Sequence, residues 1–294
     1  MASSALPQFG IITLSYAPDF ERCRLLAATV QRCIIEPFTH YIIVDQRDLE
    51  LFKTLENYNT EIITVESLLP WWIFRIPTVK KTWFSVKTLP IRNWLLQQIV
   101  KIMAAKTLPK DVFAFVDSDV CFVRPFDFKT FVDGDQIRLF RVPSYQNDSF
   151  TPWFINAHQL LGLPDFQPGQ KHPNFVGNVI TWKQENVIKM CNHIEATLGK
   201  SWIKAVAQCW QFSEYVLYGT FVDQVLGEAS GHYPDWAPLC HEYWDPKTLS
   251  DSELKQFFLD LDPENVAVMI SAKAEIDPQR YQAVIESLVS PPKV

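Results

Sequence analysis

Residues 112–125 read VFAFVDSDVCFVRP, the most informative stretch of this 294-residue chain. Its five leading apolar residues predict a buried strand that is covered on both faces. Asp117 and Asp119 follow at once, and we expect both to point the same way while the backbone stays extended. Carboxylates beside buried chain are costly unless they meet a cation. The pattern predicts a site for a hard divalent ion, Mn²⁺ or Mg²⁺; a solvated turn is the alternative.

The segments before this stretch alternate between strand-like and helix-like patterns. Apolar runs predict strands at 9–15, 41–44 and 61–65, and helical spacing predicts helices that begin at Asp19 and at Pro90. Such an order indicates the α/β class, with a mostly parallel central sheet flanked by helices. Ligands of these sheets bind at the carboxyl ends of the strands, where Ser15, Tyr16 and Asp45 also lie.

The second half is less regular. Strands are predicted at 133–141, 175–182 and 266–270, and a long loop at 144–173. Helices are predicted at 184–198, 213–226 and 250–261, with a last one from Asp277. Neither a linker nor an internal repeat interrupts the sequence, so we expect one domain over residues 1–294.

Composition excludes several classes of protein. With 48% hydrophobic and 20% charged residues, a net charge of −6 and no basic run, the chain fits neither a disordered protein nor a nucleic-acid groove. The nine glycines form no GxGxxG, GxxxxGK[ST] or GxSxG pattern. The six cysteines are scattered, and we see neither a signal peptide nor an apolar run of membrane-spanning length. We therefore expect a cytoplasmic protein.

The Asp117-Ser118-Asp119 motif resembles the DxD of metal-dependent GT-A type glycosyltransferases. The helix WLLQQIVK at 94–101 is similar to that of poorly characterised bacterial members. The resemblance implies a GT-A like fold in which 1–125 binds a nucleotide-sugar and 126–294, a looser half, binds the acceptor and completes catalysis. It implies a hexosyltransferase, with a UDP-sugar favoured as donor and a carbohydrate, lipid or small molecule as acceptor.

Two other functions fit the same motif. Haloacid-dehalogenase-like phosphatases also open with an apolar strand and DxD, using Mg²⁺ and an aspartate nucleophile. Their motif usually lies on the first strand, with Thr or Val where Cys121 stands here. A non-catalytic sugar-nucleotide binding module is the third interpretation, and turnover of a nucleotide-sugar with and without metal would separate all three.

On the donor side, the strand ends predict which residues hold the base and ribose: Thr13, Ser15, Tyr16 and Asp45. Gln97 and Lys101 lie one turn apart and share a helix face. Lys101 and Lys273 are candidates to neutralise the diphosphate, although a solvated lysine is an equal alternative.

Members of this superfamily often add a third metal ligand from the C-terminal part, frequently a histidine. The resemblance suggests His241, with His232 and Ser271 as rivals. A lone histidine is more often structural than a ligand.

The acceptor half should hold a carboxylate near the reacting carbon. Glu214 is the first choice because aromatic residues surround it in sequence: Trp210, Tyr215 and Tyr218. A charge in the first turn of a helix is the structural alternative, and Asp223 and Glu242 are the next carboxylates to consider. Asn178, which follows Gly177, resembles the segment that approaches the donor sugar in related enzymes.

An aromatic and basic segment runs from Leu69 to Lys87. Trp71, Trp72 and Phe74 predict peripheral contact with a membrane, or a lid over the donor. An insertion that packs its tryptophans inward is the alternative.

Overall fold

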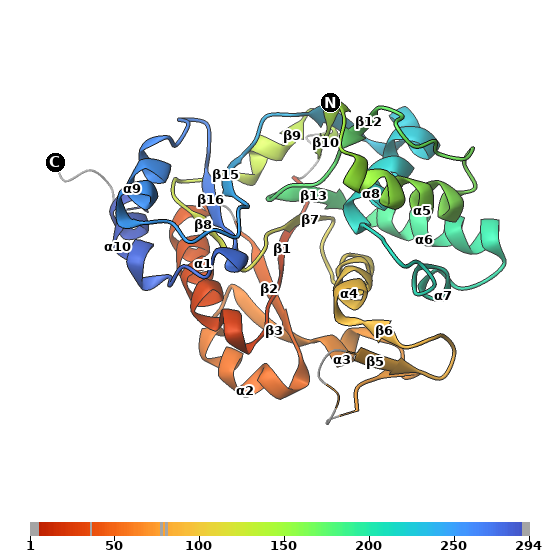
Figure 1. Cartoon of the computed structure of the whole chain (residues 1–294), viewed down its shortest axis with the longest axis horizontal. Helices are drawn as coiled ribbons and strands as arrows, with labels where there is room; N and C mark the ends of the chain where they lie inside the picture. Colours follow the sequence, from red (N-terminus) through yellow and green to blue (C-terminus); the bar gives the residue numbers. More distant parts are fainter. Residues whose placement is uncertain (1–5, 36, 77–78, 80–81, 290–294) are drawn as a thin grey trace.

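The computed structural model describes residues 6–35, 37–76, 79 and 82–289. Its central sheet has the order β13-β7-β1-β2-β3, with strands β1 (Phe9–Leu14), β2 (Thr39–Val44), β3 (Thr60–Thr64), β7 (Val112–Phe115) and β13 (Ile180–Lys183). Strands β3, β2, β1 and β7 run parallel, and β13 closes the edge antiparallel to β7. The predicted mostly parallel sheet flanked by helices is confirmed (Figure 1).

Strand β7 is buried on both faces, as its apolar sequence predicts. Phe113 and Phe115 enter one core with helices α4 (Asn93–Thr107), α6 (Gln184–Leu198) and α8 (Glu214–Thr220). Val112 and Ala114 enter another core with helix α1 (Phe20–Cys33) and strand β8 (Val120–Phe122). Helices therefore cover the sheet on opposite sides, and the end of β7 lies where the two cores meet.

Smaller sheets surround the central one. One has the order β14-β10-β9 and another β15-β16-β8, while β11 pairs with β12 and β4-β5-β6 form an antiparallel set. Their bounds are β4 (Ile73–Phe74), β5 (Thr82–Ser85), β6 (Ile91–Arg92), β9 (Val132–Asp133), β10 (Gln136–Phe140), β11 (Val142–Tyr145), β12 (His172–Asn174), β14 (His232–Asp235), β15 (Cys240–Tyr243) and β16 (Ala267–Ile270).

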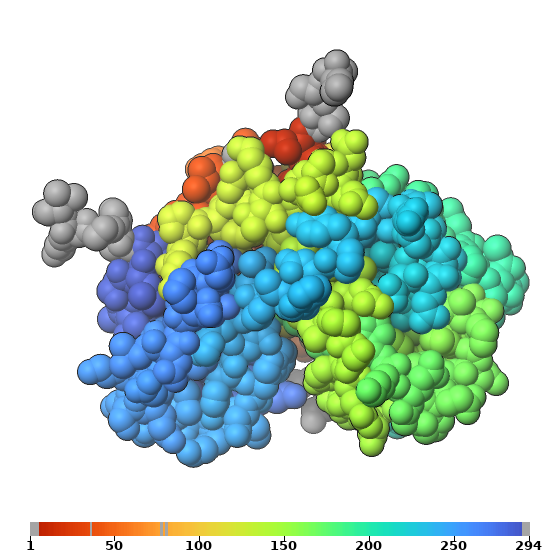
Figure 2. All heavy atoms as spheres, turned by 90° about the horizontal axis from the view of Figure 1, so that it is seen from above, coloured from red at the N-terminus to blue at the C-terminus, as the bar shows by residue number. Residues whose placement is uncertain are grey.

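The remaining α-helices are α2 (Leu49–Phe52), α3 (Val65–Leu68), α5 (Thr151–Leu161), α7 (Trp202–Val206), α9 (Asp251–Leu259) and α10 (Gln279–Val289). A π-helix, Phe221–Leu226, continues α8. The 3-10 helices are η1 (Ala17–Asp19), η2 (Gln46–Asp48), η3 (Lys53–Leu55), η4 (Phe128–Phe131), η5 (Asp148–Phe150), η7 (Gly227–Ser230) and η8 (Ala272–Ala274). In Figure 2, seen from above, the blue C-terminal part and the green middle part stand on opposite sides of the molecule.

The structure corrects several sequence predictions. The expected loop at 144–173 contains helix α5, because Pro152 sits in its first turn, where proline is tolerated, and Gly162 ends it at φ 66°. The helix expected from Pro90 begins only at Asn93, after strand β6. The strand expected at 175–182 is shortened to β13, and the sequence analysis missed α7.

One glycine fixes the approach of helix α8 to the loop before β13. A Cβ at Gly219 would lie 2.2 Å from the ring of Phe175, which is buried. Alanine at a helix interior is normally favoured over glycine by about 1 kcal/mol. Here that gain is lost to overlap with the ring.

We therefore expect Gly219→Ala to lower the free energy of unfolding by about 1–3 kcal/mol, measured by urea denaturation. Adding Phe175→Leu to the same variant should recover part of this loss, because the smaller side chain makes room. Additive losses in the double variant would contradict the packing explanation.

Candidate functional site

Two cavities open at the carboxyl edge of the central sheet. The first, of about 330 Å³, is lined by the DxD motif, α4 and the start of α8. The second, of about 290 Å³, lies between the ends of β1 and β2, α4 and the β4–β6 strands. Ser15, Tyr16 and Gln97 line both. The sheet therefore gathers several of the predicted donor residues along one edge: Ser15, Tyr16, Asp45, Gln97 and Lys101.

The DxD carboxylates lie on a turn rather than on extended chain. The N–H of Val120 donates to the carbonyl of Asp117 at 3.1 Å, so the backbone reverses between β7 and β8, which corrects the expected extended geometry. Asp119 Oδ2 accepts from the N–H of Ala272 at 2.9 Å. Burial, and then the charge of Asp117, raise the pKa of Asp119 to about 7. Two carboxylates thus share a partly buried place that a cation would stabilise.

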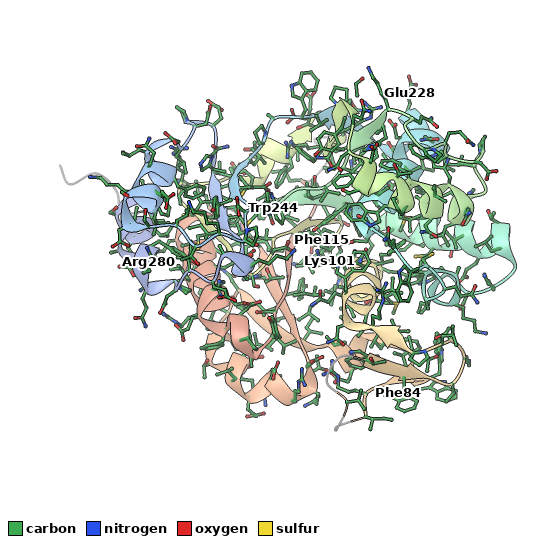
Figure 3. All side chains as sticks on the ribbon, in the orientation of Figure 1. Phe84, Lys101, Phe115, Glu228, Trp244 and Arg280 are labelled. Atoms are coloured by element: carbon green, nitrogen blue, oxygen red, sulfur yellow. The ribbon has the colours of Figure 1, made fainter. Side chains whose placement is uncertain are left out.

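Lys101 is the positive charge of the first cavity. Its Nζ lies 3.0 Å from Glu214 Oε1 and 3.3 Å from Asp117 Oδ1, and it donates to the hydroxyl of Tyr215 at 3.0 Å. Burial opposes its charge, but the electrostatic attraction of Asp117, Tyr215 and Glu214 outweighs it and holds the pKa of Lys101 well above its usual value. Figure 3 labels Lys101 near the centre of the molecule.

Local structure fixes Glu214. Ser213 caps helix α8, accepting from the N–H of Val216 at 3.3 Å, and the N–H of Glu214 donates to Gln98 Oε1 at 3.1 Å. The residue is 4% exposed overall and lines the first cavity. Glu214 therefore combines the predicted helix-end position with a charged contact to Lys101.

Only part of the expected metal ligand set fits. Among the described residues, no group of three or more His, Cys, Asp or Glu side chains is arranged to hold a metal ion. Asp117 and Asp119 are hard oxygen donors on one cavity wall, which suits Mg²⁺ or Mn²⁺ if the substrate supplies further oxygens.

The histidines do not complete that set. The ring of His241 packs on Phe257 of α9, with centroids 4.4 Å apart, and in the described part of the chain it forms no group of three metal ligands with Asp117 and Asp119, so its role as a ligand stays a prediction. His232 is buried against Tyr218 and the carbonyl of Ile137, and burial lowers its pKa to about 4. Ser271 directly precedes Ala272, which binds Asp119, but its Oγ accepts from the N–H of Lys273.

The second cavity carries a network of charge. Asp45 Oδ2 lies 2.9 Å from Arg47 and 3.3 Å from Arg75. The guanidinium of Arg75 in turn lies 4.7 Å from the ring centroid of Trp83. Tyr16 stands 43% exposed at the junction with the first cavity. An exposed ring next to paired charges suits a flat, polar ligand such as a nucleotide base.

Other predicted residues lie outside these cavities. Thr13 is completely buried and donates its hydroxyl to the carbonyl of Val116 at 2.8 Å, so it supports β7 rather than facing a ligand. Lys273 is exposed on η8, beside the segment that contacts Asp119. Ser118, in contrast, lines the first cavity between the two aspartates, and its contact with a donor stays a prediction.

The other residues predicted for the acceptor side lie apart from one another. Asn178 is buried and donates its backbone N–H and Nδ2 to Glu242 Oε1, at 3.0 and 2.9 Å, outside the first cavity. Asp223 is held by Arg141 through two bonds of 3.0 and 3.1 Å. Tyr218 is fully buried, while Trp210 is exposed beneath Arg92.

Several cavity residues escaped the sequence analysis: Asp19, Trp94, Gln98, Trp153, Arg47 and Asn93. The helical spacing of 94–101 was a usable signal for Trp94 and Gln98, since both are one turn from Gln97 or Lys101. Trp153 had none, because its helix was predicted as a loop.

One family model matches nearly the whole chain. A model of DUF6492, described as a family of unknown function, matches residues 8–291. A search of curated proteins finds no significant match.

Similar solved structures include apo mouse xyloside xylosyltransferase 1, at 11% identity over 92% of this chain and 99% of that one, with a TM-score of 0.46. Galactosyltransferase LgtC with donor and acceptor sugar analogs matches at 11% identity over 97% and 98%, with a TM-score of 0.43. An active-site mutant of LgtC matches at 12% identity over 97% and 98%, with a TM-score of 0.46. At these identities and TM-scores, the matches do not identify a donor, a metal or an acceptor for this chain.

The ion pair between Lys101 and Glu214 predicts a coupled effect on stability. Removing one partner of a buried pair costs about 3–5 kcal/mol, because the other charge stays uncompensated. We expect Lys101→Met to lower the free energy of unfolding by that amount at pH 7, measured by urea denaturation. Lys101→Met with Glu214→Gln should lose distinctly less. A loss in the double variant equal to the sum of the losses in Lys101→Met and Glu214→Gln would show that the two groups are not coupled.

Proposed function

The chain belongs to the DUF6492 family, and we propose that it is a metal-dependent glycosyltransferase that moves a sugar from a nucleotide-sugar, with a UDP-sugar favoured, to an acceptor. One observation carries the proposal: Asp117 and Asp119 end a central parallel strand and open into a cavity that also holds Lys101 and Glu214. Such folds bind their ligands at the carboxyl edge of the parallel sheet, and these two carboxylates lie at that edge.

Different parts of the donor are proposed to bind in the two cavities along the sheet edge. The second cavity suits the base and ribose, with Tyr16 as a stacking surface and Asp45 as an acceptor held by Arg47 and Arg75. The first cavity suits the diphosphate and the sugar. Gln97 lies between them and lines both, so it is placed to contact the donor near its diphosphate.

Charge in the first cavity fits the departure of a diphosphate. Asp117 and Asp119 would hold Mn²⁺ or Mg²⁺, which when bound neutralises the negative charge that develops on the leaving group. Lys101 carries a positive charge on the same wall, within 3.3 Å of Asp117. Its fixed ion pairs hold this charge in position before the donor arrives.

Glu214 is the proposed acceptor-side carboxylate. It is buried, lines the cavity and faces Lys101 rather than open solvent. A carboxylate so placed can accept the proton of an acceptor hydroxyl or orient that hydroxyl toward the sugar. Asn178 does not line this cavity. Its proposed role is indirect, because it donates a hydrogen bond to Glu242 and holds that side chain in place.

Metal binding is tested by thermal unfolding. We expect Mn²⁺ to raise the melting temperature by about 3 °C or more when UDP is present, and much less without it, because binding to the native state stabilises by mass action. Asp119→Asn should abolish this shift. Asp165→Asn, which changes an exposed aspartate elsewhere, should keep it. A full shift in the Asp119→Asn variant would remove the metal assignment.

The role of Glu214 is tested by kinetics. If it acts as a general base, Glu214→Gln should slow sugar transfer at least ~100-fold while the affinity for the nucleotide stays nearly unchanged. Asp223→Asn is the matched control, since Arg141 holds that carboxylate in a different part of the fold. Turnover within a few-fold of the parent would make Glu214 a structural partner of Lys101 only.

A further inference from the structure

Strands β4–β6 and their turns present an unusually apolar outer surface. Four side chains define it together with Lys87, and we call these five residues the aromatic–basic face: Trp71, Phe74, Val86, Lys87 and Leu89. The exposed fractions are 79% for Trp71, 81% for Leu89, 63% for Val86 and 41% for Phe74. Large apolar groups gathered within 19 residues at such exposure indicate a binding surface rather than ordinary surface variation.

The strands turn one side to the core and the other outward. Ile73, Trp83 and Ile91 are buried, with exposed fractions of 5% or less. Phe74 and Phe84 pair across β4 and β5 on the opposite side, with ring centroids 6.4 Å apart. Figure 3 shows Phe84 at the lower edge of the molecule, directed away from the body. The expected inward packing thus holds for Trp72, which is 7% exposed, but not for Trp71.

The segment that carries this face is basic. Residues 67–92 contain five Lys and Arg and no Asp or Glu, in a chain whose net charge is −6. Lys87 Nζ lies 5.4 and 5.5 Å from the ring centroids of Trp71 and Trp72. Arg92 stacks on exposed Trp210, 4.0 Å from its ring centroid, which extends the mixture of aromatic and basic groups toward α7.

We propose that the aromatic–basic face docks on the surface of a bilayer that contains anionic lipids. Tryptophan is suited to the interface because its ring is amphipathic, and lysine adds attraction to negative headgroups. No helix in the described part of the chain is long and apolar enough to cross a membrane. The contact is therefore peripheral, with Trp71 and Leu89 inserted and Lys87 at headgroup level.

Docking would bring the second cavity close to the lipid surface. Trp83 and Arg75, from the strands that carry the face, also line that cavity. Binding to the bilayer itself is independent of the proposed sugar transfer, so each can fail without the other. If both hold, the acceptor is a molecule that resides at the membrane.

Vesicle sedimentation with the full chain tests the proposal. We expect binding to vesicles of phosphatidylcholine with 30% phosphatidylglycerol, weak binding to phosphatidylcholine alone, and release as NaCl rises from about 0.05 to 0.5 M. Trp71→Ser with Leu89→Ser should weaken binding about tenfold or more, and Lys87→Glu about fivefold or more. Absence of binding by the parent chain would overturn the proposal.

Two matched control variants distinguish binding through this face from nonspecific adsorption of the protein to vesicles. Trp236→Ser changes a tryptophan that is 64% exposed between β14 and β15, and Lys255→Glu reverses an exposed charge on α9. Both should bind vesicles as the parent does, and circular dichroism should show that all variants fold. Equal losses in controls and test variants would overturn the proposal. So would a change in oligomeric state, without loss of vesicle binding, on replacing Trp71 and Leu89.

Discussion

The ammonium group of Lys101 is the contact on which the site depends. It joins helix α4 to the end of β7 through Asp117 and to the start of α8 through Glu214 and Tyr215. These elements come from distant parts of the chain, and each brings a group that would be costly to bury alone. The charge network therefore ties the start of α8 to helix α4 and to the end of the central strand β7.

Much of the fold follows from local pattern. Strands buried on both faces read as continuous apolar runs, and β7 is such a run, so the parallel sheet was predictable from sequence. Helix α5 was not, because Pro152 and the polar residues around it are typical of loops as well as of a first helical turn. Its stability comes from burying Phe154 against the core, a tertiary effect that no local pattern records.

The site residues also divide into those whose positions the sequence predicts and those whose positions it does not. Asp117, Lys101 and Glu214 were predictable because strand ends and helix faces fix where they point. The surroundings of His241 were not, because neighbouring strand residues face opposite sides and the sequence does not reveal which side meets the cavity. In the structure Glu242 faces Asn178 while His241 packs on α9. Helical spacing places Gln98 one turn before Lys101, but its contact with the N–H of Glu214 has no motif in the sequence.

The alternation of side chains along a strand also gives the β4–β6 sheet two different faces. Trp83 points inward and lines a cavity beside Asp45, whereas its neighbour Phe84 points away from the body. A two-sided strand lets the outer side vary without disturbing the inner one, because their contacts are separate. Trp71 and Trp72 repeat this division in a turn. The second cavity and the aromatic–basic face thus lie on two sides of one small sheet, whose hydrogen bonds fix them relative to each other.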